Sequence, residues 1–212
     1  MADTLPMLSL LETRVLGTLV EKQRTVPDTY PLSVNALLAG CNQKTSRNPV
    51  IEASESDVVH AIDVLKGLWL VNEISGSRVS RFEHRLEKIL GVPTQASALL
   101  TVLMLRGPQT AGELRLNCER LHRFADISSV EAFLEELASR EAGALVVELP
   151  RLPGSRENRW MHLLSGEPEI ETMQPAKSSH TPNHEIEELK ARVTVLETEL
   201  AEMRARLTAI GA

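Results

Sequence analysis

Arginine and lysine side chains gather in three short segments of the chain, and such cations are the groups that phosphates attract. Segment 43–48 holds two cations and no acid, segment 76–88 four against two, and segment 150–160 three against one, so each has a net charge of +2. The candidate nucleic-acid contacts are Lys44, Arg47, Arg78, Arg81, Arg156 and Arg159. The same charges would also suit a solvated surface or a protein partner.

Other residues that commonly perform chemistry lack suitable partners. Cys41 and Cys118 occupy matching places in two predicted helices, which is typical of small buried residues. His84 and His162 each follow an aromatic residue by two positions, which indicates packing rather than chemistry. No Cys or His pair has metal-site spacing, and we find neither a glycine-rich phosphate loop nor a nucleophile motif. We expect no catalytic residue, metal or cofactor, and the polar run 42–44 remains the one place for a bound ligand.

The apolar pattern predicts two sets of three helices. Leucines at helical spacing recur in order, and their equivalent pairs are Leu16 and Leu100, Leu37 and Leu114, and Leu65 and Leu137. Ser33 and Thr110 are suitable first residues for the second helix of each set. Thr110 and Glu113 also fit a capping box, in which each side chain satisfies a free amide of the first turn.

A pair of strand-like stretches follows each set of helices. Residues 70–74 and 81–84 flank one turn, and residues 144–149 and 159–162 flank the other. Three helices closed by a hairpin is the winged-helix arrangement. The sequence therefore predicts a mainly α fold with small β-hairpins (α+β). Two tandem winged-helix domains would occupy residues 1–91 and 92–166.

Several longer strings resemble those of the bacterial YceH-like family. They are residues 19–24, 30–35, 39–50, 105–114 and 156–164. The resemblance covers about residues 8–166 and implies a tandem winged-helix fold, in agreement with the repeat. It carries over no catalytic residue, ligand or cofactor.

The third helix of each set is acidic. Residues 54–68 have three acids against one cation, a net charge of −2, and residues 128–142 have four against one, a net charge of −3. We expect Glu131 and Glu135 to point outward. Acids there would repel DNA phosphates, so the pattern argues against a third helix in the major groove. It favours contact through the wings and the loop before the third helix.

The end of the chain has a different composition. Residues 167–183 read as a linker, and residues 184–212 as a coiled-coil helix with an unbroken heptad pattern. The predicted oligomerisation residues are Ile186, Leu189, Val193, Leu196, Leu200, Met203, Leu207 and Ile210. The charged residues that flank these heptad positions would attract those of the partner helix in a parallel homodimer. The alternative is an amphipathic helix packed on its own domains.

Composition bounds the environment of the protein. The hydrophobic content of 42% and charged content of 25% are ordinary for a folded soluble chain. The longest apolar run, 99–105, is too short to span a bilayer, and the first residues lack the features of a secretion signal. Two cysteines form no disulfide framework. We expect a cytoplasmic protein without membrane contact.

Two functions remain open from the sequence. The first is a non-enzymatic, DNA-binding, regulator-like homodimer that contacts phosphates through its wings and loops. The second is a protein-interaction adaptor of a chromosome-associated or regulatory complex, which acidic third helices would suit. Fold analogy alone does not decide between them.

Overall fold

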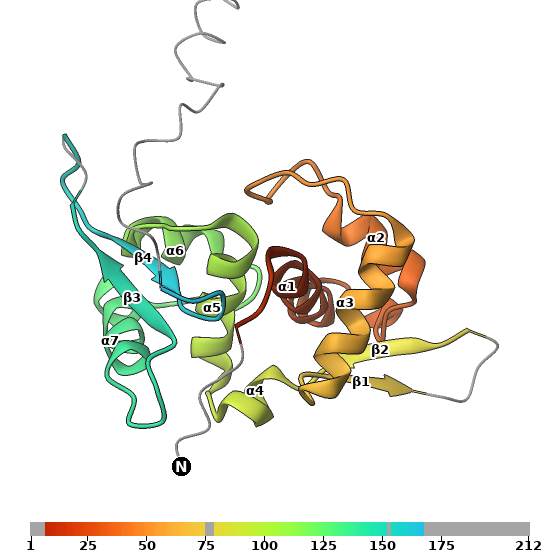
Figure 1. Cartoon of the computed structure of the whole chain (residues 1–212). Coiled ribbons are helices and arrows are strands. Elements are labelled where there is room, and N and C mark those ends of the chain that lie inside the picture. The colour runs from red at the N-terminus through yellow and green to blue at the C-terminus, as the bar shows by residue number, and fades with distance from the viewer. Residues whose placement is uncertain (1–6, 75–78, 152–153, 168–212) are drawn as a thin grey trace, which may run out of the picture. The chain divides into compact units, whose positions relative to one another are not determined.

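The computed structural model describes residues 7–74, 79–151 and 154–167 of the 212-residue chain. The chain divides into two compact units, Met1–Glu167 and Pro168–Ala212, and only the first contains described residues. These residues form seven α-helices, one 3₁₀ helix and two antiparallel two-stranded sheets, which confirms the predicted mixture of helices and small hairpins (Figure 1). The predicted coiled coil, with its eight heptad residues, lies outside the described residues.

The elements of the first half are α1 (Leu10–Thr25), a 3₁₀ turn (Pro27–Thr29), α2 (Val34–Cys41), α3 (Glu55–Gly67), β1 (Val71–Ile74), β2 (Arg81–His84) and α4 (Leu86–Leu90). Those of the second half are α5 (Thr94–Arg106), α6 (Ala111–Asn117), α7 (Ile127–Ala138), β3 (Val146–Leu149) and β4 (Arg159–His162). Each half thus has three helices followed by a hairpin in the predicted order.

Side-chain caps fix where most of these helices begin. Ser33 and Thr110 cap α2 and α6 as predicted, and Thr110 completes its capping box with Glu113. Three further capping boxes, at Ser9, Ser54 and Asp126, open α1, α3 and α7. Each cap satisfies amides that the first helical turn would otherwise leave without a partner.

In each half, a residue just before the second helix pairs with the hairpin in the manner of a short third strand. Leu32, just before α2, exchanges two backbone hydrogen bonds with Phe82 on β2, at 3.1 and 2.8 Å. Gln109, just before α6, makes the same exchange with Trp160 on β4, at 3.1 and 2.7 Å. This bridge ties the start of the second helix to the hairpin in both halves, so the repeat extends to the backbone pairing.

The halves pack together through their first helices. α1 and α5 lie side by side (Figure 1), and every residue of the stretches 13–20 and 96–105 is buried. A helix that is buried on all sides belongs to the core rather than to a surface. Gly17 permits the close approach, because a Cβ there would lie 3.0 Å from the side chain of Leu105. The core of the described residues is therefore continuous across both halves.

Candidate anion-binding site

The loop between α2 and α3, residues 42–54, is held by hydrogen bonds that are buried or partly buried. Arg14 of α1 is fully buried and donates to the carbonyl oxygens of Cys41, at 3.2 Å, and Pro49, at 2.7 Å. The side-chain amide of Asn42 donates to the carbonyl of Ala53 and accepts its backbone N–H, both at 2.9 Å. Asn42, singled out as part of a polar run, thus closes the loop internally.

Arg47 is also used inside the protein. Its side chain is 0% exposed, and its guanidinium forms a two-pronged ion pair with Glu21 of α1, at 2.7 and 3.1 Å. It also donates to the carbonyl of Gly40 and to Gln43. The planar guanidinium suits such bidentate pairing. Because these contacts use the Arg47 guanidinium within the fold, we leave Arg47 out of the proposed phosphate contacts.

Glu21 is the carboxylate at the centre of this network. Burial would raise the pKa of Glu21, but hydrogen bonding and positive charge from Arg47, aided by Lys22, outweigh burial and lower it. The Lys22 ammonium lies 3.3 Å from Glu21 and donates to Gln43 at 3.1 Å. Glu21 is therefore ionised at neutral pH.

The remaining predicted phosphate contacts differ in whether their side chains already have partners within the protein. Lys44 and Arg156 are exposed, and their side chains form no hydrogen bond or ion pair with another described residue. Arg78 lies outside the described residues. Lys44 and Arg156 are therefore free to contact a phosphate from solution.

The other two wing arginines have partners. Arg81 is exposed and donates to the carbonyl oxygens of Thr29, at 3.3 Å, and Pro31, at 2.7 Å, which leaves its charge uncompensated. Arg159 is 44% exposed in its side chain and lies 3.8 Å from Glu113 of α6. An exposed pair at that distance contributes little, so Arg159 remains accessible.

The acidic character of the third helices is on the surface. Glu55, Asp57 and Asp63 of α3 are exposed. On α7 the exposed acids include Glu131 and Glu135, as the sequence predicts, while Val130, Leu134 and Leu137 are buried.

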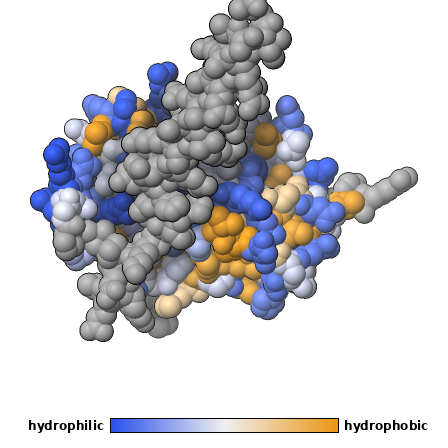
Figure 2. Space-filling view, turned by 90° about the horizontal axis from the view of Figure 1, so that it is seen from above, coloured by the Kyte–Doolittle hydropathy of each residue, from blue (hydrophilic) through white to orange (hydrophobic). Residues whose placement is uncertain are grey.

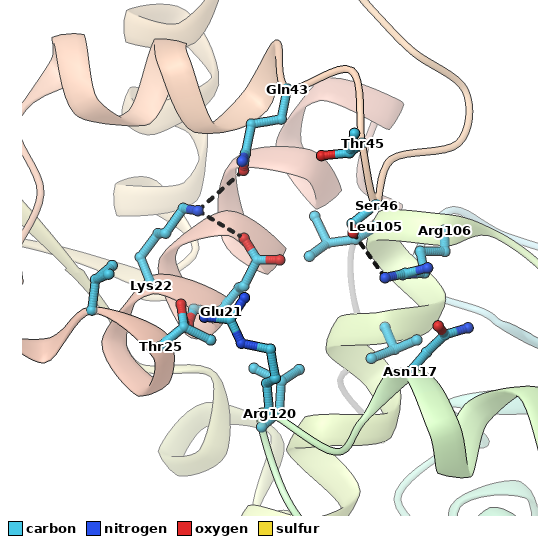
Figure 3. A pocket seen from close by; sticks show the side chains of 13 residues that line it. Glu21, Lys22, Thr25, Gln43, Thr45, Ser46, Leu105, Arg106, Asn117 and Arg120 are labelled. Atoms are coloured by element: carbon cyan, nitrogen blue, oxygen red, sulfur yellow. Dashed lines mark hydrogen bonds and ion pairs between the residues drawn. The ribbon is translucent and has the colours of Figure 1, made fainter.

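A pocket of about 200 Å³ opens between the two halves, and we call it the interhalf pocket. Its lining residues come from α1, from the loop after α2, and from α5, α6 and the turn that follows (Figure 3). They are Glu21, Lys22, Thr25, Val26, Gln43, Thr45, Ser46, Val102, Leu105, Arg106, Asn117, Arg120 and Leu121. The pocket therefore exists only because α1 and α5 pack together.

Two arginines of the second half enter this pocket opposite Glu21 and Lys22. Arg106 donates to the hydroxyl of Ser46 at 2.8 Å. Arg120 extends towards the first half in Figure 3, and its side chain has no hydrogen bond or ion pair with another described residue. Neither was singled out from the sequence. Arg106 has no other cation nearby in the sequence, and the basic segment 115–123 that holds Arg120 was overlooked. The pocket itself forms only when the halves meet.

A second hollow of about 330 Å³ adjoins the interhalf pocket. The two share Ser46, Arg106 and Asn117, and the second reaches Glu113 and Arg159. The cations of the pocket and of the second hairpin thus border one continuous part of the surface.

His84, His162 and the two cysteines have environments that suppress charge. Burial lowers the pKa of His84 and of His162 to about 4, and it raises the pKa of Cys118 to about 12 and that of Cys41 as well. Both thiols are therefore protonated at neutral pH and are poor nucleophiles. Within the described residues, no group of three or more His, Cys, Asp or Glu side chains is placed to hold a metal.

The geometry defines a class of small mixed α and β proteins, with a duplicated helix–hairpin unit and a cationic pocket between the copies. Residues 8–155 match a family model described as "Protein of unknown function, DUF480", and the chain belongs to this family. The resemblance to an uncharacterised bacterial family is thereby confirmed.

Relatives that are 61–80% identical cover between 81% and 98% of the chain. A UPF0502 protein of Dechloromonas aromatica is 80% identical over 207 residues, covering 98% of this chain and 97% of its own length. A UPF0502 protein of Methylibium petroleiphilum is 67% identical over 172 residues (81% and 73% coverage). One from Burkholderia pseudomallei is 61% identical over 200 residues (93% and 85%). Among the described residues, no helix combines the length and apolarity needed to cross a membrane.

Proposed function

We propose that each half is a winged-helix domain and that the protein binds duplex DNA through its phosphates, without catalysing a reaction. The three helices, the hairpin and the additional strand-like bridge in both halves support the winged-helix assignment. The observation that carries the DNA proposal is the position of the accessible cations. Lys44 lies on the loop before α3, and Arg81, Arg156 and Arg159 lie on or beside the hairpins.

This arrangement favours contact with the DNA backbone rather than with base edges. Base readout by a winged helix would place α3 or α7 in the major groove. The exposed acids of both helices, including Glu131 and Glu135, oppose that approach because they repel phosphates. Binding of this kind tolerates many sequences and weakens steeply with salt.

The proposal includes a cytoplasmic homodimer. The heptad residues between Ile186 and Ile210 would join two chains, so that four winged helices share one DNA molecule. Linked modules bind more tightly than single ones because the second contact becomes intramolecular.

Fluorescence anisotropy with a labelled duplex of arbitrary sequence tests the proposal. We expect measurable binding at 50 mM salt whose logarithmic salt slope falls by about 1 for each phosphate contact removed. The combined variant Lys44→Ala, Arg156→Ala, Arg159→Ala removes three such contacts. The opposite variant, Glu131→Gln with Glu135→Gln, removes repulsion and should strengthen binding. Absence of binding at low salt, or specific binding abolished by changes on α7 alone, would contradict the proposal.

A second candidate function is that of a protein-interaction adaptor. The specific observation is a shallow surface on α3 where Val59, 40% exposed, lies among Glu55, Asp63 and His60. The face seen in Figure 2 also shows an apolar area between hydrophilic residues. Apolar surface rimmed by polar residues is typical of protein contacts. Capture from cell lysate with and without nuclease separates the candidates, since a protein partner would survive nuclease treatment.

A further inference from the structure

We propose that the interhalf pocket binds a small phosphate-bearing anion, a role that goes beyond contact with DNA. The pocket is positive in a protein whose net charge is −6. Three cations line it, Lys22, Arg106 and Arg120, against the single acid Glu21, which gives a formal charge of +2. Glu21 is already neutralised by the buried Arg47, so the pocket lacks an acid that could balance both arginines.

The hydrogen-bonding groups of the pocket suit phosphate oxygens. Arg106 uses one donor on the Ser46 hydroxyl and has others left, and all donors of the Arg120 guanidinium remain without a partner among the described residues. Guanidinium groups bind phosphate through two parallel N–H donors. The hydroxyl of Thr45 adds a neutral donor, whereas that of Thr25 already donates to the carbonyl of Glu21 at 2.9 Å.

The size of the pocket selects a small anion. Pockets for drug-sized ligands enclose 300–1,000 Å³, whereas this one encloses about 200 Å³. Inorganic phosphate or pyrophosphate fits within the interhalf pocket alone, whereas a nucleotide would have to extend into the adjoining hollow of about 330 Å³. The side chains that would hold it come from both halves, so binding favours the packed arrangement of α1 and α5 and stabilises the folded chain by mass action.

Thermal unfolding and calorimetry of the full chain test this assignment. The probes are sodium phosphate and sodium pyrophosphate, compared with sodium chloride at matched ionic strength. We expect both phosphates to raise the melting temperature beyond the chloride reference and to give a saturable binding isotherm. Loss of one charge-assisted contact should weaken the affinity about ten-fold.

The variants are Arg106→Gln and Arg120→Gln, alone and combined, with Arg123→Gln as the matched control. Arg123 is exposed three residues beyond Arg120 and lines a different pocket. We expect the double variant Arg106→Gln, Arg120→Gln to lose the phosphate response and the Arg123→Gln control to keep it. In chloride, both should have the melting temperature of the wild-type chain. Equal responses to phosphate and chloride, or an unchanged phosphate response in the combined variant, would overturn the proposal.

A DNA arm separates the free anion from a backbone phosphate of nucleic acid. The combined variant should bind duplex DNA as the wild type does, and added pyrophosphate should not compete with DNA beyond the matched chloride effect. If instead the variant loses DNA binding and free phosphate gives no isotherm, these arginines serve the nucleic acid and the small-anion assignment fails. Failure of DNA binding in the wild-type chain would leave the phosphate result intact.

Discussion

Arg14 and Arg47 both bring positive charge into the interior of the first half, but they are compensated differently. Arg47 has the carboxylate of Glu21, whereas Arg14 has only carbonyl oxygens, and its Nε has no partner in the described structure. Burial and, to a smaller degree, the charge of Arg47 lower the pKa of Arg14. Removing one member of a buried pair costs more than the pair contributes, because the other charge stays buried.

We therefore expect Arg47→Ala to lower the free energy of unfolding by about 3 kcal/mol, since Glu21 keeps only Lys22 as a partner. Urea denaturation followed by circular dichroism measures the change. Lys44→Ala is the control, because Lys44 is exposed and a surface substitution changes stability by only about 0.5 kcal/mol or less. Similar losses in the two variants would show that the Arg47–Glu21 pair does not stabilise the loop.

His162 provides a pH-dependent contribution to stability. It is 7% exposed with a pKa of about 4, against about 6.5 in an unfolded chain. The unfolded state therefore binds the proton first, and stability falls as the pH drops from about 6.5 towards 4. The full effect is about 3 kcal/mol. His162→Gln should flatten this part of the profile, leaving the slope due to His84.

Urea midpoints measured between pH 7.5 and 4 test this expectation. His60→Gln is the control because His60 is exposed on α3, and its profile should follow that of the wild type. An unaltered slope in His162→Gln would mean that another group carries the acid sensitivity.

At the scale of the elements, α2 is placed by a close contact with α1. Gly40 is buried, and a Cβ there would lie 2.5 Å from Cγ2 of Thr18. Thr18 is itself buried and β-branched, so its side chain has little freedom to move. The glycine is therefore required for packing at this position.

Gly40→Ala should accordingly destabilise the protein by about 1–3 kcal/mol, although alanine is the better helix former. Thr18→Ser removes the clashing methyl group and keeps the hydroxyl, which lies 3.8 Å from the sulfur of Cys41. The double variant Gly40→Ala, Thr18→Ser should recover most of the loss in thermal unfolding. If the double variant loses as much stability as the two single variants together, the methyl contact is not the cause of the loss.

The elements were predictable where the local pattern is strong. Ser33 and Thr110 mark helix starts that the structure confirms, because a capping side chain acts within one turn. The short helix α4 was missed, since five residues carry too little periodicity to indicate a helix. The bridge from Leu32 to Phe82 was also missed, because it joins residues 50 positions apart.

At the scale of the whole molecule, the contact between α1 and α5 created the candidate site. A nearly all-apolar helix over 98–105 was a signal of complete burial, but it does not say which helix covers it. Arg106 and Arg120 therefore looked like ordinary surface residues in the sequence. In contrast, Arg47 stood out as a basic loop residue, and its partner Glu21, 26 positions earlier, could not be assigned without the fold.

Assembly is the property of the whole chain that we predict from the heptads. Sedimentation of the full chain should give a dimer, and a chain ending at Gly166 should give a monomer. Leu196→Glu with Leu200→Glu places like charges in the seam and should dissociate the dimer without unfolding residues 8–164. The control is Thr194→Glu with Thr198→Glu, on the outer face of the same heptads. If the full and shortened chains have the same oligomeric state, the heptad residues do not form the interface.

The burial of residues 13–20 of α1 has a consequence for biosynthesis. The ribosome releases α1 long before α5, since their last residues, Thr25 and Arg106, lie 81 positions apart. At 5–20 residues per second this interval is roughly 4–16 s. During that time the apolar face of α1 that α5 will cover remains open to water. We therefore expect the nascent first half to be more prone to aggregation than the finished chain until the second half arrives to cover this face.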